Sequence, residues 1–221
     1  MGGEVAVAVH PGINFYNVKG KYNGILAWVL STDHKRIGLL YLTSMLSLFA
    51  VAAILGVLLR LELIAPGPTI MGPQTYNSFF TLHGVIMIFM FVIPGLSASF
   101  GNFLLPIMIG AEDVAFPRVN LLSWWLFISG ATVGILSLFT GSGFADTGWT
   151  FYAPYSLRTG TNTSMAVFAA FLLGLSSILT GLNFMTTIHR LRAPGMTWFR
   201  LPLFIWAVYA TAWMQVLATP V

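Results

Sequence analysis

Long apolar runs alternate along this chain with short stretches rich in polar residues, glycine and proline. Five runs are long enough to cross a membrane, at 37–63, 79–105, 121–140, 165–188 and 201–219. A helix needs about 20 mostly apolar residues to span a hydrocarbon core about 30 Å thick. The pattern therefore predicts an all-α, polytopic transmembrane bundle of about five helices over 37–221, preceded by an N-terminal segment over 1–36.

Composition excludes an ordinary soluble domain. Hydrophobic residues make up 57% of the 221 residues and charged residues 7%, against about 45–50% and about 25% in soluble domains. So few charges cannot cover a water-facing surface. Cysteine is absent, which excludes disulfides, thiolate metal sites and cysteine nucleophiles.

The two ends of the sequence predict how the chain is inserted into the membrane and whether it is part of a longer molecule. Residues 1–22 lack the apolar core after a basic start that marks a cleavable signal peptide, so the first span is the expected insertion signal. At the other end, the fifth run has barely finished at Val221 and no polar tail follows it. We therefore expect the sequence to be one part of a longer molecule.

The formal net charge of +4 is explained by membrane topology rather than by nucleic acid. The basic residues lie beside the spans and not in a cluster with interleaved aromatic residues. One side has Lys19, Lys21, Lys35, Arg36, Arg118, Arg190, Arg192 and Arg200, and the other has Arg60 and Arg158. The positive-inside rule then predicts that the N-terminus is cytoplasmic.

His83 lies in the second run, in an apolar stretch with no acid or base beside it. An ionisable side chain inside a span is costly and indicates function. Imidazole is the usual axial ligand of haem iron, and Gly84 beside it would let a flat macrocycle approach the backbone. A histidine that donates to a carbonyl of a neighbouring helix explains the residue equally well.

Arg60 and Glu62 lie near the outer end of the first run. The simpler interpretation, which we favour on the residues alone, is that both side chains extend to the membrane interface. In the alternative, Arg60 points inward to a polar substituent. Glu62 and the carbonyls after it then offer hard oxygen ligands to a cation such as calcium.

Two adjacent carboxylates, Glu112 and Asp113, lie between the second and third runs. The stretch is typical of a capped loop that enters a helix, and an aspartate at a channel mouth can also collect protons. Polar side chains in three of the spans would continue such a path: Asn102, Asn120, Ser176, Ser177 and Asn183. Small polar residues also hold helices together, and their spacing does not separate the two roles.

Four segments in order are more specific than any single residue. They are STDHKRIG at 31–38, TLHGVIMIF at 81–89, IGAEDVAFPR at 109–118 and RAPGMT at 192–197. From about Trp28 to the last residue, the chain closely resembles cytochrome c oxidase subunit I, the main subunit of the haem-copper terminal oxidases. The resemblance implies the N-terminal part of the twelve-helix core of a respiratory oxidase, which couples oxygen reduction to proton pumping.

The same resemblance implies roles around a low-spin haem. His83 is one axial ligand of its iron, and Arg60 bonds to its formyl group if the haem is haem A, which we expect. Trp149 lies near the haem edge on the outer side. Glu62, with the carbonyls of Ala65 and Gly67, matches a calcium or sodium site of the family.

By the same matching, Asp113 is the entrance of the D-type proton pathway. The side chains placed along that pathway are Asn102, Asn120, Ser177 and Asn183. Glu112 falls at a more variable position, and no role is assigned to it.

Everything that the family places after its fifth helix is missing from this chain. The high-spin haem and copper are therefore expected on other polypeptide, and this chain alone is not expected to reduce oxygen. The expected partners are the rest of the oxidase core, copper-bearing subunit II, subunit III-like chains, cytochrome c and the lipid bilayer, with no nucleic acid. The expected location is a bacterial cytoplasmic or mitochondrial inner membrane, with the N-terminus on the cytoplasmic or matrix side.

Two alternatives stay open. The quinol-oxidising branch of the family carries an arginine and an aspartate in the first helix, and Val51 and Leu55 at the matching positions favour cytochrome c as the donor. The other alternative is a transporter or scaffold bundle without catalysis. Inverted repeats or spans broken at the midplane would support a transporter, and the sequence contains neither.

Overall fold

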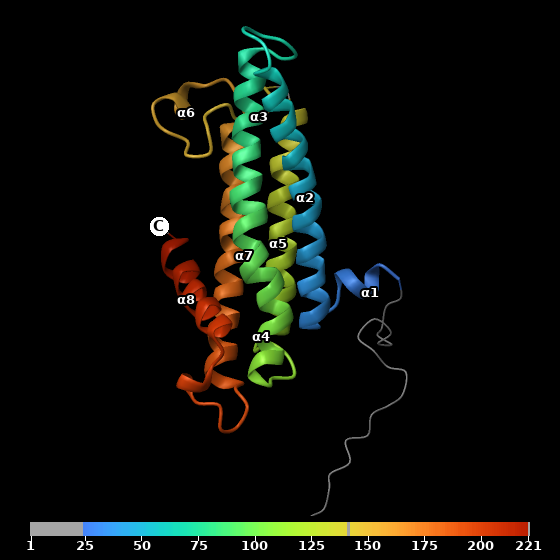
Figure 1. Cartoon of the computed structure of the whole chain (residues 1–221), viewed down its shortest axis with the longest axis vertical. Helices are drawn as coiled ribbons and strands as arrows, with labels where there is room; N and C mark the ends of the chain where they lie inside the picture. Colours follow the sequence, from blue (N-terminus) through green and yellow to red (C-terminus); the bar gives the residue numbers. More distant parts are fainter. Residues whose placement is uncertain (1–23, 141, 221) are drawn as a thin grey trace, which may run out of the picture.

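The computed structural model describes residues 24–140 and 142–220, and every regular element in that part of the chain is a helix (Figure 1). This confirms the predicted all-α class. The expected N-terminal segment lies outside the described residues over 1–23, including Lys19 and Lys21.

The helices follow one another along the chain with short connections. In order they are α1 (Leu26–Val29), α2 (His34–Glu62), α3 (Pro73–Val85), η1 (Ile86–Val92), η2 (Gly95–Gly101), α4 (Asn102–Ile109), α5 (Pro117–Leu136), η3 (Ser137–Phe139), α6 (Tyr155–Arg158), α7 (Thr163–Arg190), η4 (Trp198–Arg200) and α8 (Leu203–Ala218). The elements from α3 to α4 run on as one long helix, in which η1 and η2 are π-helical. Pro94 lies between these two segments and cannot donate a backbone hydrogen bond, so the wider turns occur where the regular ladder is interrupted.

Four helical stretches are long and apolar enough to cross a membrane: His34–Glu62, Pro73–Ile109, Pro117–Phe139 and Thr163–Arg190. Each coincides with one of the first four predicted runs. The fifth run coincides with α8, which is apolar but has only 16 residues. Apolar side chains such as Ile54, Leu96 and Phe168 are exposed on the bundle surface, as expected where lipid is the solvent.

Local sequence explains where these helices begin and end. The Asp33 carboxylate caps α2 by accepting hydrogen bonds from the backbone N–H groups of Lys35 (3.0 Å) and Arg36 (2.9 Å). Pro73 and Pro117 begin their helices, where a missing N–H costs nothing. At the end of α4, Gly110 has φ +73°, a left-handed conformation that favours glycine.

Small residues let the helices approach closely. A Cβ at Gly130 of α5 would lie 2.9 Å from the carbonyl oxygen of Ala169 in α7. A Cβ at Gly181 of α7 would lie 2.9 Å from the carbonyl oxygen of Ala212 in α8. In lipid, where water does not drive helices together, such close backbone contact is a main source of association. The bundle is therefore built around α7, with α5 and α8 against it.

Candidate functional site

His83 of α3 packs its ring against α2. Its Nδ1 lies 2.8 Å from the carbonyl oxygen of Ala52, and because a carbonyl only accepts, Nδ1 carries the proton. Gly56 lies one turn further along α2, where a Cβ would stand 3.1 Å from the Cε1 atom of His83. The glycine thus makes room for the imidazole on the α2 surface.

This contact leaves the other ring nitrogen for coordination. Protonation at Nδ1 makes Nε2 the unprotonated nitrogen of a neutral imidazole. No side chain or backbone group of the described residues hydrogen-bonds to Nε2, and the ring is half-buried. A histidine oriented by a carbonyl through one nitrogen and open at the other is a common arrangement for a metal or haem ligand.

Arg60 lies on the same face of α2 as the residues under His83. Ala52, Gly56 and Arg60 follow one another at intervals of four residues, which places them on one helix face. Arg60 is exposed and lies one turn beyond Gly56, towards the end of α2.

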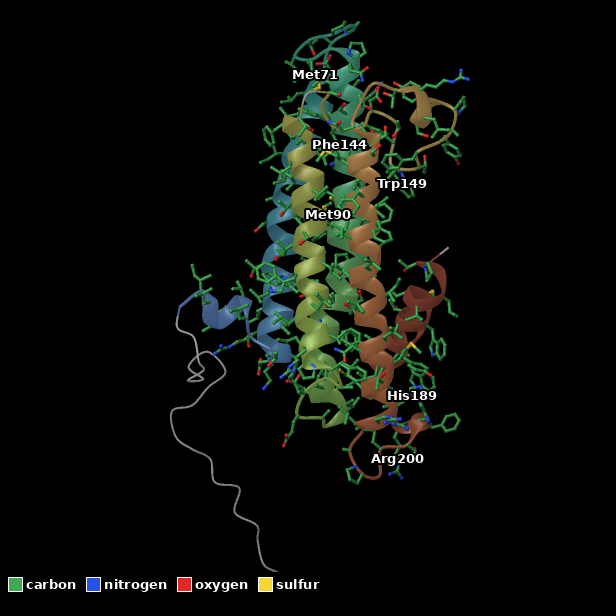
Figure 2. All side chains as sticks on the ribbon, turned by 180° about the vertical axis from the view of Figure 1, so that it is seen from behind. Met71, Met90, Phe144, Trp149, His189 and Arg200 are labelled. Carbon is green, nitrogen blue, oxygen red and sulfur yellow. The ribbon has the colours of Figure 1, made fainter. Side chains whose placement is uncertain are left out.

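The loop between α5 and α7 packs Trp149 against α3. The indole Cδ1 lies 3.3 Å from where a Cβ of Gly84 would be, and the ring meets Phe89 edge-on at 6.1 Å between centroids. Figure 2 shows Trp149 at the same end of the bundle as Met71. Gly84 is therefore packed against this indole, and Gly56 of α2 makes room for the His83 ring. The expectation that a macrocycle approaches the backbone at Gly84 stays a prediction.

Asp146 anchors this loop, and the sequence analysis missed it. The side chain is 5% exposed. Its carboxylate accepts hydrogen bonds from Gln74 (2.6 Å), Thr159 (2.8 Å), Thr161 (2.9 Å) and the Tyr155 hydroxyl. Burial acts to raise the pKa of Asp146, but the hydrogen bonds outweigh it and the pKa lies below its usual value. Since an acid in a stretch with Gly and Thr is common in turns, the sequence held no signal for this role.

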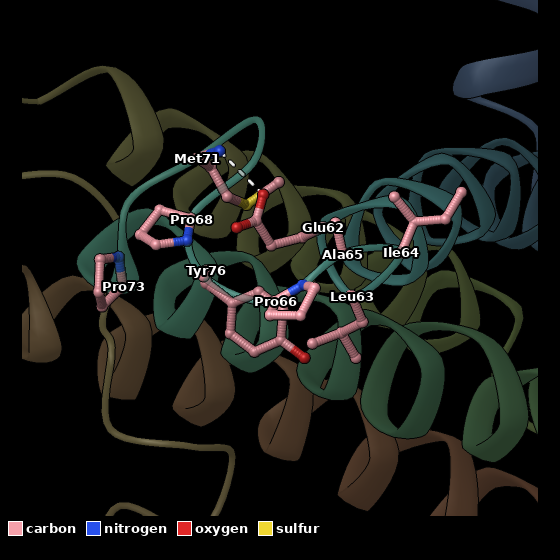
Figure 3. Close-up of a pocket in the computed structure, with 10 residues that line it drawn as sticks. Glu62, Leu63, Ile64, Ala65, Pro66, Pro68, Met71, Pro73 and Tyr76 are labelled. Carbon is pink, nitrogen blue, oxygen red and sulfur yellow. Dashed lines mark hydrogen bonds between the residues drawn. The ribbon is translucent and has the colours of Figure 1, made fainter.

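Glu62 clamps the loop that follows α2. Its carboxylate accepts hydrogen bonds from the backbone N–H groups of Thr69 (2.9 Å), Ile70 (2.8 Å) and Met71 (2.9 Å), as Figure 3 shows for Met71. A pocket borders the clamp, lined in part by Ala65 and Gly67. Within residues 24–140 and 142–220, no group of three or more His, Asp or Glu side chains is placed to hold a metal ion.

Asp113 lies at the opposite end of the bundle, in the loop between α4 and α5. The side chain is half-buried, and its Oδ1 accepts a hydrogen bond of 2.7 Å from the backbone N–H of Val114. Burial raises the pKa of Asp113, and that hydrogen bond and the nearby His34 oppose the rise. His34 in turn lies 2.8 Å, through Nδ1, from the carbonyl oxygen of Asn102.

A column of buried polar groups leads from this end into the bundle. Ser123 donates to the carbonyl oxygen of Asn120 at 2.7 Å, and the Tyr41 hydroxyl donates to Ser123 at 3.0 Å. The same hydroxyl lies 3.1 Å from Ser176. We call Asn120, Ser123, Tyr41 and Ser176 the polar column. Beyond it, Ser177 borders a small cavity that leaves about 10 Å³ for the centre of a water molecule, about the minimum that one water requires.

The three predicted asparagines are all buried but differ in their bonding. Asn183 accepts from the backbone N–H of Phe116 at 2.8 Å, so it also holds the loop that carries Asp113. The side-chain oxygen of Asn102 and both polar side-chain atoms of Asn120 are buried and have no partner among the described residues. Such atoms are rare in proteins unless water fills the space beside them.

Tyr41 and Ser123 were absent from the predicted set, although both are fully buried. The signal was present in part, because Ser176, Thr180, Asn183 and Thr187 form a polar stripe along one face of α7. No periodicity in α2 indicates that a lone tyrosine meets that stripe. Only the packing of three helices brings these hydroxyls together.

Together, apolar spans, an inward-turned histidine and a buried polar column define a polytopic helical integral membrane protein. Residues 36–221 match the family model described as Cytochrome C and Quinol oxidase polypeptide I, and the chain belongs to that family. It is 42% identical over 202 residues to a probable cytochrome c oxidase subunit 1-alpha of Streptomyces avermitilis, and 41% identical over 202 residues to the protein of that name in Streptomyces coelicolor. Each match covers 90% of this chain and 35% of the relative, so the chain spans about a third of their length.

Proposed function

We propose that this chain forms the N-terminal part of the core of a respiratory cytochrome c oxidase, in which His83 is one axial ligand of a low-spin haem. The observation that carries the proposal is the orientation of His83, bonded through Nδ1 to Ala52 and open at Nε2. The Ala52 carbonyl fixes the tautomer and the ring plane, and it makes Nε2 more basic. When bound, the haem supplies one-electron transfer from cytochrome c towards a haem–copper centre that reduces oxygen to water.

The residues around His83 suit a large, flat ligand. Gly56 allows the imidazole to lie close to α2, and Arg60 on the same face offers a fixed charge and five donors to a polar substituent. A formyl group is such a substituent, which supports haem A. Trp149, held by the loop around Asp146, would border the same region from the outer end.

The second proposed task of the chain is to admit protons. Asp113 is half-buried at the end of the bundle where α2 begins and α4 ends, and its raised pKa favours proton uptake near neutral pH more than an exposed aspartate would. The unpartnered amide atoms of Asn102 and Asn120 mark space that suits water. A proton would then pass along the polar column towards Ser177 and its cavity, with Asn183 holding the entrance loop.

The proposed cation site at Glu62 has weaker support. Its carboxylate already accepts hydrogen bonds from three backbone N–H groups and from the Thr69 hydroxyl. A calcium or sodium ion would have to share those oxygens with the carbonyls of Ala65 and Gly67. Neither interpretation drawn from the residues included this clamp, in which the Glu62 side chain is 7% exposed and holds the loop.

The remaining parts of the proposed enzyme lie outside this chain. The second axial ligand, the high-spin haem and the copper would be held by the rest of the oxidase core. Subunit II, subunit III-like chains and cytochrome c would be its partners in a bacterial cytoplasmic or mitochondrial inner membrane. The N-terminus would lie on the cytoplasmic or matrix side, from which Asp113 would take protons.

An absorption spectrum with metal analysis of the purified intact protein tests this proposal. We expect a low-spin haem band together with iron and copper, and loss of that band in His83→Ala. His189→Ala is the matched control, because His189 is exposed and bonds only to Tyr209 among the described residues. An unchanged low-spin band in His83→Ala would remove the ligand assignment.

The choice of electron donor separates the cytochrome c branch from the quinol branch. Val51 and Leu55 stand where the quinol branch carries polar residues, so reduced cytochrome c is the expected donor. Oxygen consumption with reduced cytochrome c, compared with a quinol, measures this directly. Faster consumption with the quinol would assign the chain to the other branch, and no consumption with either would favour a bundle without catalysis.

A further inference from the structure

Gln215 of α8 is a buried polar side chain that has no part in the site described above. The side chain is 8% exposed. Its Nε2 donates to the Oγ atom of Ser97 in η2 at 3.1 Å, and Ser97 is buried as well. The Oε1 atom of Gln215 is buried and has no hydrogen-bond partner among the described residues. A buried amide oxygen costs free energy unless a donor reaches it.

The hydrogen bonds of Ser97 determine which end of the Gln215 amide is unpaired. The Ser97 hydroxyl donates its one proton to the carbonyl oxygen of Ile93 at 2.8 Å. Towards Gln215 this hydroxyl can therefore only accept, so the amide atom that faces it is the Nε2 donor. Turning the amide by 180° would bring two acceptors face to face. Oε1 is thus the atom that still needs a donor.

Gln215 and Ser97 both border the small cavity beyond the polar column, which has room for about one water molecule. Four hydroxyl-bearing side chains share its lining: Tyr41, Ser176, Ser177 and Thr180. The cavity therefore joins α8 and η2 to the proposed proton path. Its lining is polar enough to give a water the two to four partners that a buried water normally has.

Most hydroxyl protons around the cavity are already donated to acceptors of the protein. Tyr41 donates to Ser123 at 3.0 Å, Ser176 donates to the carbonyl oxygen of Ser123 at 2.7 Å, and Thr180 donates to that of Ser176 at 2.9 Å. The Ser177 hydroxyl differs, because it donates to no other described residue. A water in the cavity can thus accept from Ser177 and donate to Oε1 of Gln215.

We propose that Gln215 is a positioning residue of the proton path, which holds a water molecule in this cavity through Oε1 while Ser97 fixes the amide. The inference rests on the proposed function, since it extends the path beyond Ser177. In a transfer, the water accepts a proton from the Ser177 side and releases its second proton, the one not bonded to Gln215. The water keeps its formula, and Gln215 keeps both amide protons because an amide does not titrate at neutral pH.

A density map of the intact protein that shows ordered water tests the site without reference to activity. We expect a water within about 3 Å of Oε1 of Gln215 and no water at that place in Gln215→Leu. A protein donor on Oε1 from another part of the core would overturn the proposal. A map with no density beside Oε1 would do the same.

Oxygen consumption by the intact enzyme in H2O and in D2O tests the role. Gln215→Leu is expected to lower turnover about tenfold, the factor for one lost hydrogen bond. The ratio of the rates in H2O and D2O should rise, because proton transfer then limits turnover. Reduction of the low-spin haem by cytochrome c does not need this proton and should keep its parent rate, whereas a general structural defect would slow both steps.

Thr211→Val is the matched control, since Thr211 lies one turn away in α8 and its hydroxyl donates to Ala207 of its own helix at 2.9 Å. If Gln215→Leu does not assemble, as judged by haem content, Ser97→Ala carries the test. That variant keeps Gln215 but removes the acceptor of Nε2, so a smaller loss of the same kind is expected.

The result that contradicts the proposed role is equal turnover and an equal isotope ratio in Gln215→Leu and Thr211→Val. A loss in Gln215→Leu beside normal turnover in Asp113→Asn would reject the proposed entrance at Asp113 and keep the site at Gln215. The two proposals can therefore fail separately.

Discussion

At the scale of single residues, three buried or half-buried side chains differ by the hydrogen bonds available to them. Among the described residues, His83 is hydrogen-bonded through Nδ1 alone, which leaves Nε2 without a hydrogen-bond partner there. Asp146 is saturated with donors and acts as an anchor. Asp113 is half-buried and accepts a hydrogen bond of 2.7 Å from the backbone N–H of Val114, and burial raises its pKa, which supports its proposed role in proton uptake.

Asp113→Asn in the intact enzyme is expected to suppress turnover and proton pumping together, by about 100-fold for a lost acid–base group. The amide has the same shape but carries no titratable proton. Oxygen consumption and the acidification of the medium around vesicles measure the two quantities. The matched control is Glu112→Gln, because Glu112 is exposed and adjacent. Normal turnover in Asp113→Asn would remove the residue from the pathway.

The raised pKa of Asp113 also predicts the sign of a pH effect on stability. Above both pKa values the carboxylate is ionised in the folded and unfolded states, and burial then opposes folding. Stability due to this group is therefore present below the usual aspartate pKa and is lost as the pH rises through the folded value. The melting temperature of Asp113→Asn, measured as a function of pH, should not show this loss of stability.

Asp146→Asn is expected to loosen the loop that carries Trp149. An amide cannot accept from four donors as a carboxylate does, and each unmet charged hydrogen bond costs about 1.5–3 kcal/mol. Because the pKa of Asp146 is lowered, its contribution is present above the usual aspartate pKa and is lost as the pH falls through the folded value. The asparagine variant should not show this acid-induced loss.

Limited proteolysis and thermal unfolding measure the loop directly. Tyr155→Phe removes one donor to Asp146, and Tyr152→Phe is its control because Tyr152 is 76% exposed in the same loop. Equal protease sensitivity of the two variants would contradict the anchoring role.

At the scale of elements, close contact between helix backbones determines the packing. Gly130→Ala would place a Cβ 2.9 Å from a backbone oxygen of α7, which cannot move without displacing the helix. We expect destabilisation of about 1–3 kcal/mol, the usual cost of overpacking. Gly134→Ala, one turn along α5, meets the flexible end of Met90 at 3.3 Å and makes an ordinary contact with the Ala169 Cβ at 3.7 Å. Thermal unfolding should separate the two variants, and equal melting temperatures would show that α5 and α7 can move apart at little cost.

The ends of the helices and the π-helical turns are features that a hydropathy pattern does not predict. Each predicted run coincides with a helix, but α2 begins at His34 and α7 at Thr163, because helices continue into the polar residues that flank the apolar core. The π-helical turns around Pro94 were not predicted. Hydrophobicity does not distinguish a π turn from an α turn, whereas a proline already indicates an interrupted ladder.

At the scale of the whole molecule, the side of the membrane on which each end lies is an open prediction. The positive-inside rule places Arg118, Arg190, Arg192 and Arg200 on the cytoplasmic or matrix side. The chain has no cysteine, so one introduced cysteine gives an unambiguous label within it. A membrane-impermeant maleimide should label Gly160→Cys in intact cells and Thr197→Cys only after permeabilisation. The opposite pattern would reverse the orientation.

By itself, the sequence determined the number and approximate position of the apolar helices, because partition into lipid depends on composition over about 20 residues. Together with the four ordered segments, it also determined the family, since each segment keeps its own residues in order. His83 and Asp113 became candidates at this level, because an ionisable residue in an apolar run and a pair of adjacent carboxylates between two runs are both visible in the sequence.

Only the tertiary structure decided which atoms of these residues have hydrogen-bond partners. The sequence could not show that Ala52 accepts from one nitrogen of His83, that Gly56 makes room for the ring, or that Tyr41 meets Ser123 and Ser176. These contacts join residues up to 135 positions apart. Hydrogen bonds act over about 3 Å, and such distances between remote residues are determined by how the helices pack and not by local pattern.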